Sequence, residues 1–186
     1  MAGSAENRSG RGVPWRPIGW GGLGVVLLIP LVARFPWSLG DFVFAGAILG
    51  GAGVAIELGA RVSTSPAYRG GVAVAVLTAV ALVWVNGAVG LLGDEDNPEN
   101  LVFGAVILIA ALCAARAGFR PAGMARALFA AAATQLAIGV AAMAIGFVVP
   151  GRDWLSEAVL GTGLFTTLWL VAAALFRKAA RQELAA

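Results

Sequence analysis

Residues 70–92, GGVAVAVLTAVALVWVNGAVGLL, decide the class of this protein. The stretch contains no charged residue, and its hydroxyl and amide side chains are those of Thr78 and Asn86. At a rise of about 1.5 Å per residue, a helix of this length covers the roughly 30 Å of hydrocarbon in a bilayer. An unbroken apolar run of this kind is typical of a helix surrounded by lipid. We therefore expect this segment to cross a membrane.

Similar apolar blocks recur along the whole chain. Because prolines fall mainly between the blocks, where a missing N–H group does no harm, each block is expected to be one helix. The predicted transmembrane helices cover residues 18–35, 42–60, 70–92, 101–117, 123–149 and 154–176. The sequence thus predicts an all-α integral membrane bundle of six transmembrane helices, one domain over residues 18–178. A flexible basic N-terminal arm, 1–17, and a short cytoplasmic tail, 179–186, are expected to flank it.

The composition agrees with a membrane environment. Of the 186 residues, 60% are hydrophobic and 12% are charged, whereas soluble domains carry about 25% charged residues. So few charges cannot cover a water-facing surface, which excludes a soluble enzyme, a disordered chain and a disulfide scaffold. A net charge of +3 is also too small to favour nucleic acid as a partner.

The basic residues predict the orientation of the chain. When alternate ends of the predicted helices are compared, Arg34 and Arg152 fall on one side of the membrane. The other side receives Arg8, Arg11, Arg16, Arg61, Arg69, Arg116, Arg120, Arg126, Arg177, Lys178 and Arg181. Because Lys and Arg accumulate on the cytoplasmic side, an even number of crossings with both termini cytoplasmic fits this bias, and five or seven crossings do not.

Several kinds of cofactor chemistry lack their usual ligands here. The chain has no histidine, which excludes a bis-histidine haem site, a histidine-bearing zinc site and a histidine general base. The single cysteine, Cys113, lies in an apolar run and is expected to be a small buried hydrophobe. Lys178 follows the last apolar block, so a Schiff base in mid-membrane is also excluded. We expect no cofactor.

Polar side chains inside the predicted helices are the first functional candidates, because burying them in a bilayer is costly. Glu57 lies near the cytoplasmic boundary with Arg61 at i+4, a spacing that suits an interfacial ion pair. The sharper hypothesis is a proton or cation site. Asn86 and Gln135 are expected to bond to neighbouring helices as structural contacts, with a polar path across the membrane as the alternative.

Glycines on the second predicted helix form a candidate packing face. Gly46 and Gly50 have the small-xxx-small spacing that allows two helices to approach closely, and Gly53 extends the groove. Such a face can serve packing inside the bundle or docking of another subunit, and the sequence does not distinguish the two.

The loop GDEDNPEN, residues 93–100, concentrates carboxylates on the outer side. The simpler interpretation is a solvated acidic turn in which Asn100 caps the following helix. The alternative is cation binding, for which Asp94, Asp96 and Glu99 are weak metal-ligand candidates. The glycine and the distal glutamate of an EF-hand loop are missing.

Three segments carry a resemblance to a known group of proteins. They are LVWVNGAVG at 82–90, EDNPENLVF at 95–103 and FRPAGMAR at 119–126. The chain resembles, over most of residues 20–178, a family of small and mostly uncharacterised bacterial inner-membrane proteins. The resemblance implies a compact multi-helix protein that passes several times through the bacterial inner (cytoplasmic) membrane, and it implies no activity.

Three functions remain open from the sequence. We expect a non-catalytic structural or accessory subunit that packs in the lipid bilayer against other membrane subunits or against itself. The first alternative is a small oligomeric transporter or channel with a weakly polar path. The second is a membrane enzyme at the outer face, built from the carboxylates Asp94, Glu95, Asp96, Glu99, Asp153 and Glu157.

Overall fold

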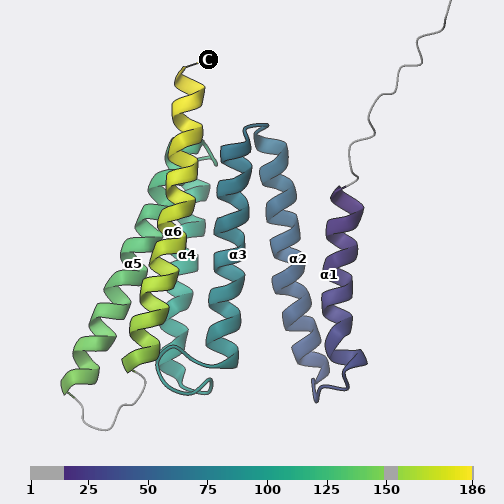
Figure 1. Cartoon of the computed structure of the whole chain (residues 1–186), viewed down its shortest axis with the longest axis vertical. Helices are drawn as coiled ribbons and strands as arrows, with labels where there is room; N and C mark the ends of the chain where they lie inside the picture. Colours follow the sequence, from purple (N-terminus) through teal and green to yellow (C-terminus); the bar gives the residue numbers. More distant parts are fainter. Residues whose placement is uncertain (1–14, 149–154, 186) are drawn as a thin grey trace, which may run out of the picture. The chain divides into compact units, whose positions relative to one another are not determined.

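The computed structural model describes residues 15–148 and 155–185. In these ranges all regular secondary structure is helical, so the expectation of an all-α protein is confirmed for the part of the chain that is described. The elements are α1 (Trp15–Val32), α2 (Leu39–Val62), α3 (Pro66–Ala88), the 3-10 helix η1 (Pro98–Phe103), α4 (Gly104–Arg116), α5 (Pro121–Val148) and α6 (Leu155–Leu184) (Figure 1).

Five of the helical segments are long and apolar enough to cross a membrane. They are α2, α3, the continuous segment Pro98–Arg116 formed by η1 and α4, and most of α5 and of α6. The apolar helix α1 is shorter. The protein is therefore a multi-pass helical membrane protein.

Two helix starts are fixed by serine caps. At the start of α2, the amide and hydroxyl of Ser38 donate to Asp41 Oδ2 at 2.7 and 2.8 Å, and the Asp41 amide donates back to Ser38 Oγ at 3.3 Å. This reciprocal arrangement is a capping box. At the start of α3, Ser65 Oγ accepts from the Tyr68 amide, and Pro66 occupies the first turn, where its missing N–H group is not needed.

The chain divides into two compact units, with the boundary between Gly53 and Val54 inside α2. In the described part of unit 1, α1 contacts α2 at Gly53. A Cβ atom at Gly53 would be 2.9 Å from Leu23 Cδ1 and 3.1 Å from the ring of Trp20. Gly53 therefore acts as a packing glycine within unit 1.

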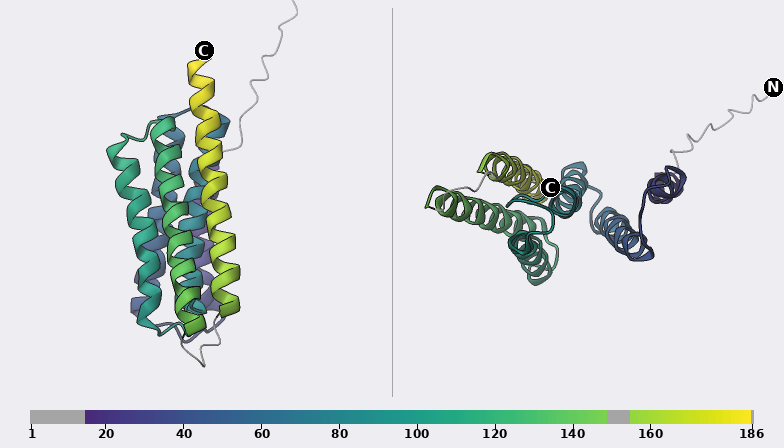
Figure 2. Two further views of the ribbon diagram at one scale, coloured as in Figure 1. Left: turned by 90° about the vertical axis from the view of Figure 1, so that its left-hand side faces the viewer. Right: turned by 90° about the horizontal axis from the view of Figure 1, so that it is seen from below.

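Unit 2 begins at Val54 and contains the main hydrophobic core. The most extensive contact joins α5 and α6; α6 also packs on α3, and α5 also packs on α4 (Figure 2). The side chains of Phe165, Trp169 and Phe176 on α6 are almost fully buried. Since these large side chains all come from one helix, α6 is the central element of the unit.

Helix α3 ends earlier than the expected block 70–92. Gly90 has a φ of +78° and its amide donates to the Val85 carbonyl, which closes the helix after Ala88. Leu91 and Leu92 are buried at 4% and 5% exposure beyond the helix end. The apolar character of these two leucines thus serves a buried turn rather than a longer helix.

The other ends also differ from the expected bounds. Helix α1 starts at Trp15, within the expected arm 1–17, and α6 continues through most of the expected tail 179–186. Ala179 is still buried at 1% exposure, and the residues that follow it are mainly good helix formers. The expected boundary at residue 149 and Arg152 lie outside the described residues.

Candidate functional site

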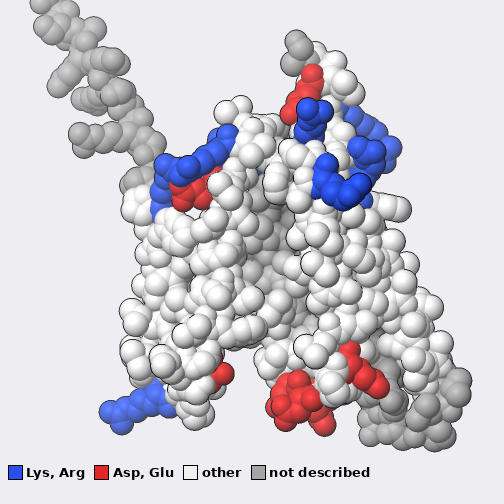
Figure 3. All heavy atoms as spheres, turned by 180° about the vertical axis from the view of Figure 1, so that it is seen from behind, with Lys and Arg blue, Asp and Glu red and all other residues white. Residues whose placement is uncertain are grey.

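Opposite charges gather at opposite ends of unit 2. Because its helices alternate in direction, α3 and α5 start at the same end at which α4 and α6 finish. That end carries the basic residues Arg61, Arg69, Arg116, Arg120, Arg126, Arg177, Lys178 and Arg181. The other end carries the acidic loop, and both accumulations are visible in the right-hand part of Figure 3.

At the basic end, two side chains tie the helices together. Arg69 Nε donates to the Ser63 carbonyl at 2.8 Å, and Arg69 Nη2 donates to the Ala60 carbonyl at 2.9 Å. These bonds satisfy carbonyl groups near the C-terminal end of α2. The Tyr68 hydroxyl donates to the Phe119 carbonyl at 2.8 Å, which joins α3 to the turn between α4 and α5. Both side chains therefore have a clear structural role.

At the opposite end, amide side chains build the turn between α3 and η1. Asn100 is 6% exposed, and its Oδ1 accepts from the amides of Leu91 and Leu92, each at 2.9 Å. Its Nδ2 donates to the Asp94 carbonyl at 2.9 Å. The expectation that Asn100 caps the following helix is wrong. Asn97 is the cap, because its Oδ1 accepts from the Glu99 amide at the start of η1.

The carboxylates of this loop lie at its surface. Asp94, Glu95, Asp96 and Glu99 are all exposed. The described residues contain no group of three or more Asp, Glu, Cys or His side chains that could hold a metal ion. Among the other carboxylates considered for an outer-face enzyme, Asp153 lies outside the described residues, and nothing is described of the Glu157 side chain.

Glu57 forms an ion pair on its own helix. Arg61 Nη2 lies 2.5 Å from Glu57 Oε1, with side-chain exposures of 62% for Arg61 and 19% for Glu57. The geometry is the i,i+4 pair that the spacing predicts. The partly exposed arginine can extend toward headgroups while the carboxylate stays on the helix surface.

The two intramembrane amides have different surroundings. Asn86 Nδ2 donates to the Leu82 carbonyl of its own helix at 2.7 Å, which leaves Asn86 Oδ1 buried without a partner among the described groups. Gln135 is 0% exposed, and neither Nε2 nor Oε1 finds a described partner. A bond from each side chain to another helix was expected, and neither bond is present among the described residues. Each unpaired buried group costs about 1–3 kcal/mol.

Three residues of α6 extend this polar environment. Thr162, Thr166 and Trp169 follow one another at i, i+4 and i+7, so they share one helix face. Thr162 Oγ1, Thr166 Oγ1 and Trp169 Nε1 are buried without a described partner. We name Gln135 and these three residues the polar cluster. Sequence reasoning passed over the two threonines because helical threonines usually bond to their own backbone, and it took Trp169 for a packing residue. The shared spacing of the three residues was the available signal.

The glycine face of α2 is open over part of its length. No atom lies within 4 Å of the position that a Cβ atom would take at Gly46 or at Gly50. Gly53, in contrast, is covered by α1. The three glycines expected to pack helices therefore differ: one is used within unit 1, and two present free backbone surface.

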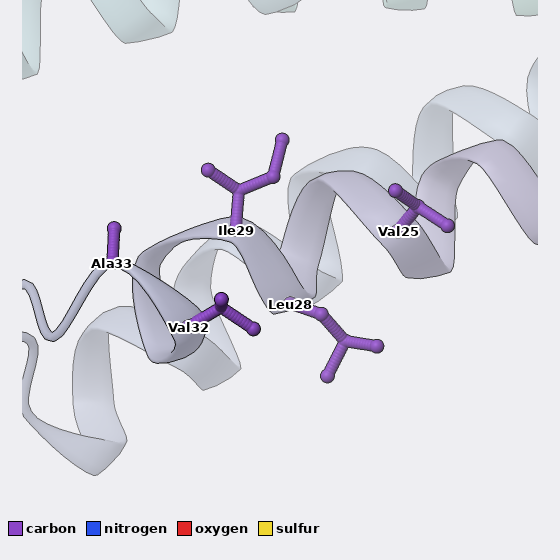
Figure 4. A pocket seen from close by; sticks show the side chains of 5 residues that line it. All are labelled: Val25, Leu28, Ile29, Val32 and Ala33. Carbon is purple, nitrogen blue, oxygen red and sulfur yellow. The ribbon is translucent and has the colours of Figure 1, made fainter.

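Unit 1 also has an apolar hollow along α1. Val25, Leu28, Ile29 and Val32, together with Ala33 just beyond the helix, line it (Figure 4). None of these side chains carries a hydrogen-bonding group. Such a surface suits lipid chains or an apolar helix.

Comparison with family models, with curated proteins and with solved structures finds no match for this chain. The resemblance to small bacterial inner-membrane proteins therefore stays a prediction.

Proposed function

We propose that this protein is a subunit of the bacterial inner membrane that crosses the bilayer six times and packs non-catalytically against membrane partners. Both termini lie in the cytoplasm in this proposal. The partner is another membrane subunit or a second copy of the chain.

The number of crossings rests on α1. Its 18 residues rise about 27 Å as an α-helix, close to the hydrocarbon thickness of a bilayer. With α1 as the sixth crossing, both ends of the chain lie on one side. The basic end of unit 2 then faces the cytoplasm, as the distribution of Lys and Arg in membrane proteins favours.

The open glycine face of α2 carries the proposal of a packing role. Gly46 and Gly50 lie one helical turn apart, and nothing within 4 Å covers them. In lipid, helices associate where small residues allow close backbone approach and dispersion contacts accumulate. A partner helix seated on Gly46 and Gly50 would gain these contacts.

The polar chemistry of the described residues supports a non-catalytic role. Glu57 is engaged by Arg61, and the loop carboxylates are exposed to solvent instead of converging on a common point. General acid–base catalysis needs a group placed at a reacting atom with a suitable environment. The described charged side chains have structural or interfacial surroundings instead.

Purification of the tagged full chain from its native membrane in mild detergent tests the proposal. We expect a stable complex with another membrane protein or a homo-oligomer. Gly46→Leu combined with Gly50→Leu should dissociate this complex, whereas Gly51→Leu, on the same helix but turned about 100° away, should leave it intact. A monomer with nothing bound, or equal effects of the two changes, would contradict the proposal.

A small transporter or channel is the second candidate, and the burial of Gln135 favours it. A fully buried amide without a described partner is unusual for a purely structural helix, since buried polar groups are normally hydrogen-bonded. Flux of small polar solutes through proteoliposomes tests this function. Flux that persists when Glu57, Asn86 and Gln135 are all replaced by apolar residues would remove it.

A further inference from the structure

The polar cluster lies inside unit 2 and has no part in the proposed packing role. Gln135 and Thr162 are 0% and 3% exposed, and Trp169 is 1% exposed. Five polar atoms of the cluster find no hydrogen-bond partner among the described groups. They are Gln135 Nε2 and Oε1, Thr162 Oγ1, Thr166 Oγ1 and Trp169 Nε1. We propose that Gln135, Thr162, Thr166 and Trp169 form an internal binding site for ordered water.

The packing of α5 on α6 places Gln135 at the level of one of the cluster's threonines. A Cβ atom at Gly139 would lie 2.0 Å from Thr162 Oγ1, so these two residues are directly opposed. The two helices run in opposite directions. One turn from Gly139 along α5 leads to Gln135, and one turn from Thr162 along α6 leads to Thr166. Gln135 and Thr166 therefore lie at the same level of the bundle.

Helix α3 also packs on α6, so it forms a third side of the polar cluster beside α5 and α6. Gly71 lies against Phe176, because a Cβ atom there would be 3.0 Å from the ring. Thr78 lies seven residues after Gly71 on α3, and Trp169 lies seven residues before Phe176 on α6. Because the two helices are antiparallel, Thr78 and Trp169 lie at the same level of the bundle. Thr78 is 2% exposed. The indole of Trp169 thus lies at the level of a second buried hydroxyl.

Other threonine hydroxyls in these helices donate to a backbone carbonyl of their own helix, which distinguishes them from the threonines of the cluster. The hydroxyls of Thr78, Thr134 and Thr167 donate to the carbonyls four residues earlier at 2.7, 2.9 and 2.7 Å. The Thr162 and Thr166 hydroxyls make no such bond. Since the ordinary intrahelical solution is open to every helical threonine, its absence at these two positions indicates another partner.

The chemistry of the cluster selects a small neutral partner. The sequence carries no Asp, Glu, Lys or Arg between residues 127 and 148 of α5 or between 158 and 176 of α6, so nothing there balances an ion. Trp169 and Gln135 Nε2 need acceptors, Gln135 Oε1 needs a donor, and the hydroxyls serve as both. Water meets all of these needs, and a buried water typically has two to four polar partners.

The end of the cluster nearest the acidic loop is closed by packing. A Cβ atom at Gly161 would lie 2.4 Å from Leu91 Cδ2, so the buried turn is in direct contact with α6 beside Thr162. Leu91 itself is 4% exposed. The proposed water site is therefore closed by packing on this side.

Water-edited solid-state NMR on the full chain in lipid bilayers tests the proposal. With ¹⁵N-labelled tryptophan, magnetisation from water is followed to the six indole N–H groups. The Trp169 signal is assigned by its loss in Trp169→Phe. If that chain does not fold, single variants at the other five tryptophans identify it as the remaining signal. We expect the Trp169 indole to receive water magnetisation within milliseconds.

Two matched variants complete the test. Gln135→Leu should slow the transfer to the Trp169 indole at least threefold, whereas Thr134→Val, which removes the neighbouring self-satisfied hydroxyl, should leave it unchanged. The wild-type measurement stands even where Gln135→Leu does not fold. No transfer to Trp169 in the wild type, or transfer unchanged by Gln135→Leu, overturns the proposal. A higher thermal midpoint for Gln135→Leu also overturns it, because removing an unpartnered amide from a dry site stabilises the fold.

Discussion

Asn100 is the side chain that holds the acidic turn in place. It accepts from two consecutive buried amides and donates to a carbonyl, so one residue satisfies three backbone groups. Sequence analysis identified this loop and Asn100, but it predicted that Asn100 caps the following helix, whereas Asn100 bonds to the amides of Leu91 and Leu92. A cap is defined by where the next helix begins, and that helix begins with the 3-10 turn at Pro98, which apolar patterning does not reveal.

Replacing Asn100 should therefore destabilise the protein. Asn100→Ala leaves the buried amides of Leu91 and Leu92 unpaired and should lower the free energy of unfolding by about 2–4 kcal/mol. Glu95→Ala changes an exposed side chain of the same loop and should alter it by less than about 0.5 kcal/mol. Denaturant titration in mixed micelles measures both. Equal, small effects would mean that the amide framework does not support the turn.

Gly90 gives a second test at the scale of one residue. Its φ is +78°, and a Cβ atom there would lie 2.3 Å from the Gly93 carbonyl oxygen. Gly90→Ala should cost at least about 2 kcal/mol of unfolding free energy through backbone strain and overlap.

Gly87 is the matched control, because it lies three residues earlier in α3 with nothing within 4 Å of its Cβ position. Gly87→Ala should stabilise the helix by about 0.5–1 kcal/mol. The same thermal or chemical unfolding series compares the two. A neutral effect at Gly90 would show that α3 ends in another way.

At the scale of the helices, glycines allow neighbouring elements to approach α6 closely. Gly139 lies directly against Thr162, and Gly161 lies against Leu91. The sequence analysis singled out Gly46, Gly50 and Gly53 by their spacing alone. Spacing identifies a groove, but it does not say which helix fills the groove. That depends on the pairing of helices distant in sequence.

The contact between Gly139 and Thr162 predicts a strong coupling between the two positions. Gly139→Ala places a methyl group into the Thr162 side chain and should cost about 1–3 kcal/mol. The exchange Gly139→Ala with Thr162→Gly moves the small residue to the facing helix, so its cost should be at least about 1 kcal/mol smaller than the sum of the single changes.

Gly163→Ala is the control for this cycle, because nothing lies within 4 Å of that position on α6. It should leave the free energy of unfolding unchanged or slightly raised. Additive effects of the Gly139 and Thr162 changes would contradict the observed helix pairing.

At the scale of the whole molecule, hydrophobic patterning predicted the class well. Long apolar blocks require helices in lipid because every backbone group must be satisfied internally, and the described helices follow those blocks closely. The division into two units at Gly53 and the self-bonding of Asn86 were not predictable. The division depends on tertiary pairing, for which a uniformly apolar sequence gives almost no signal. The Asn86 bond stays within α3 and competes with bonds to other helices.

Cysteine labelling measures the orientation of the chain in the membrane most directly. Cys113 is replaced by Ala, and one new cysteine is introduced by Glu95→Cys in the acidic loop or by Glu183→Cys near the end of α6. A membrane-impermeant maleimide is then applied to intact bacterial cells. We predict that Glu95→Cys reacts at once and that Glu183→Cys reacts only after the inner membrane is opened. Reaction of Glu183→Cys in intact cells would contradict a cytoplasmic C-terminus.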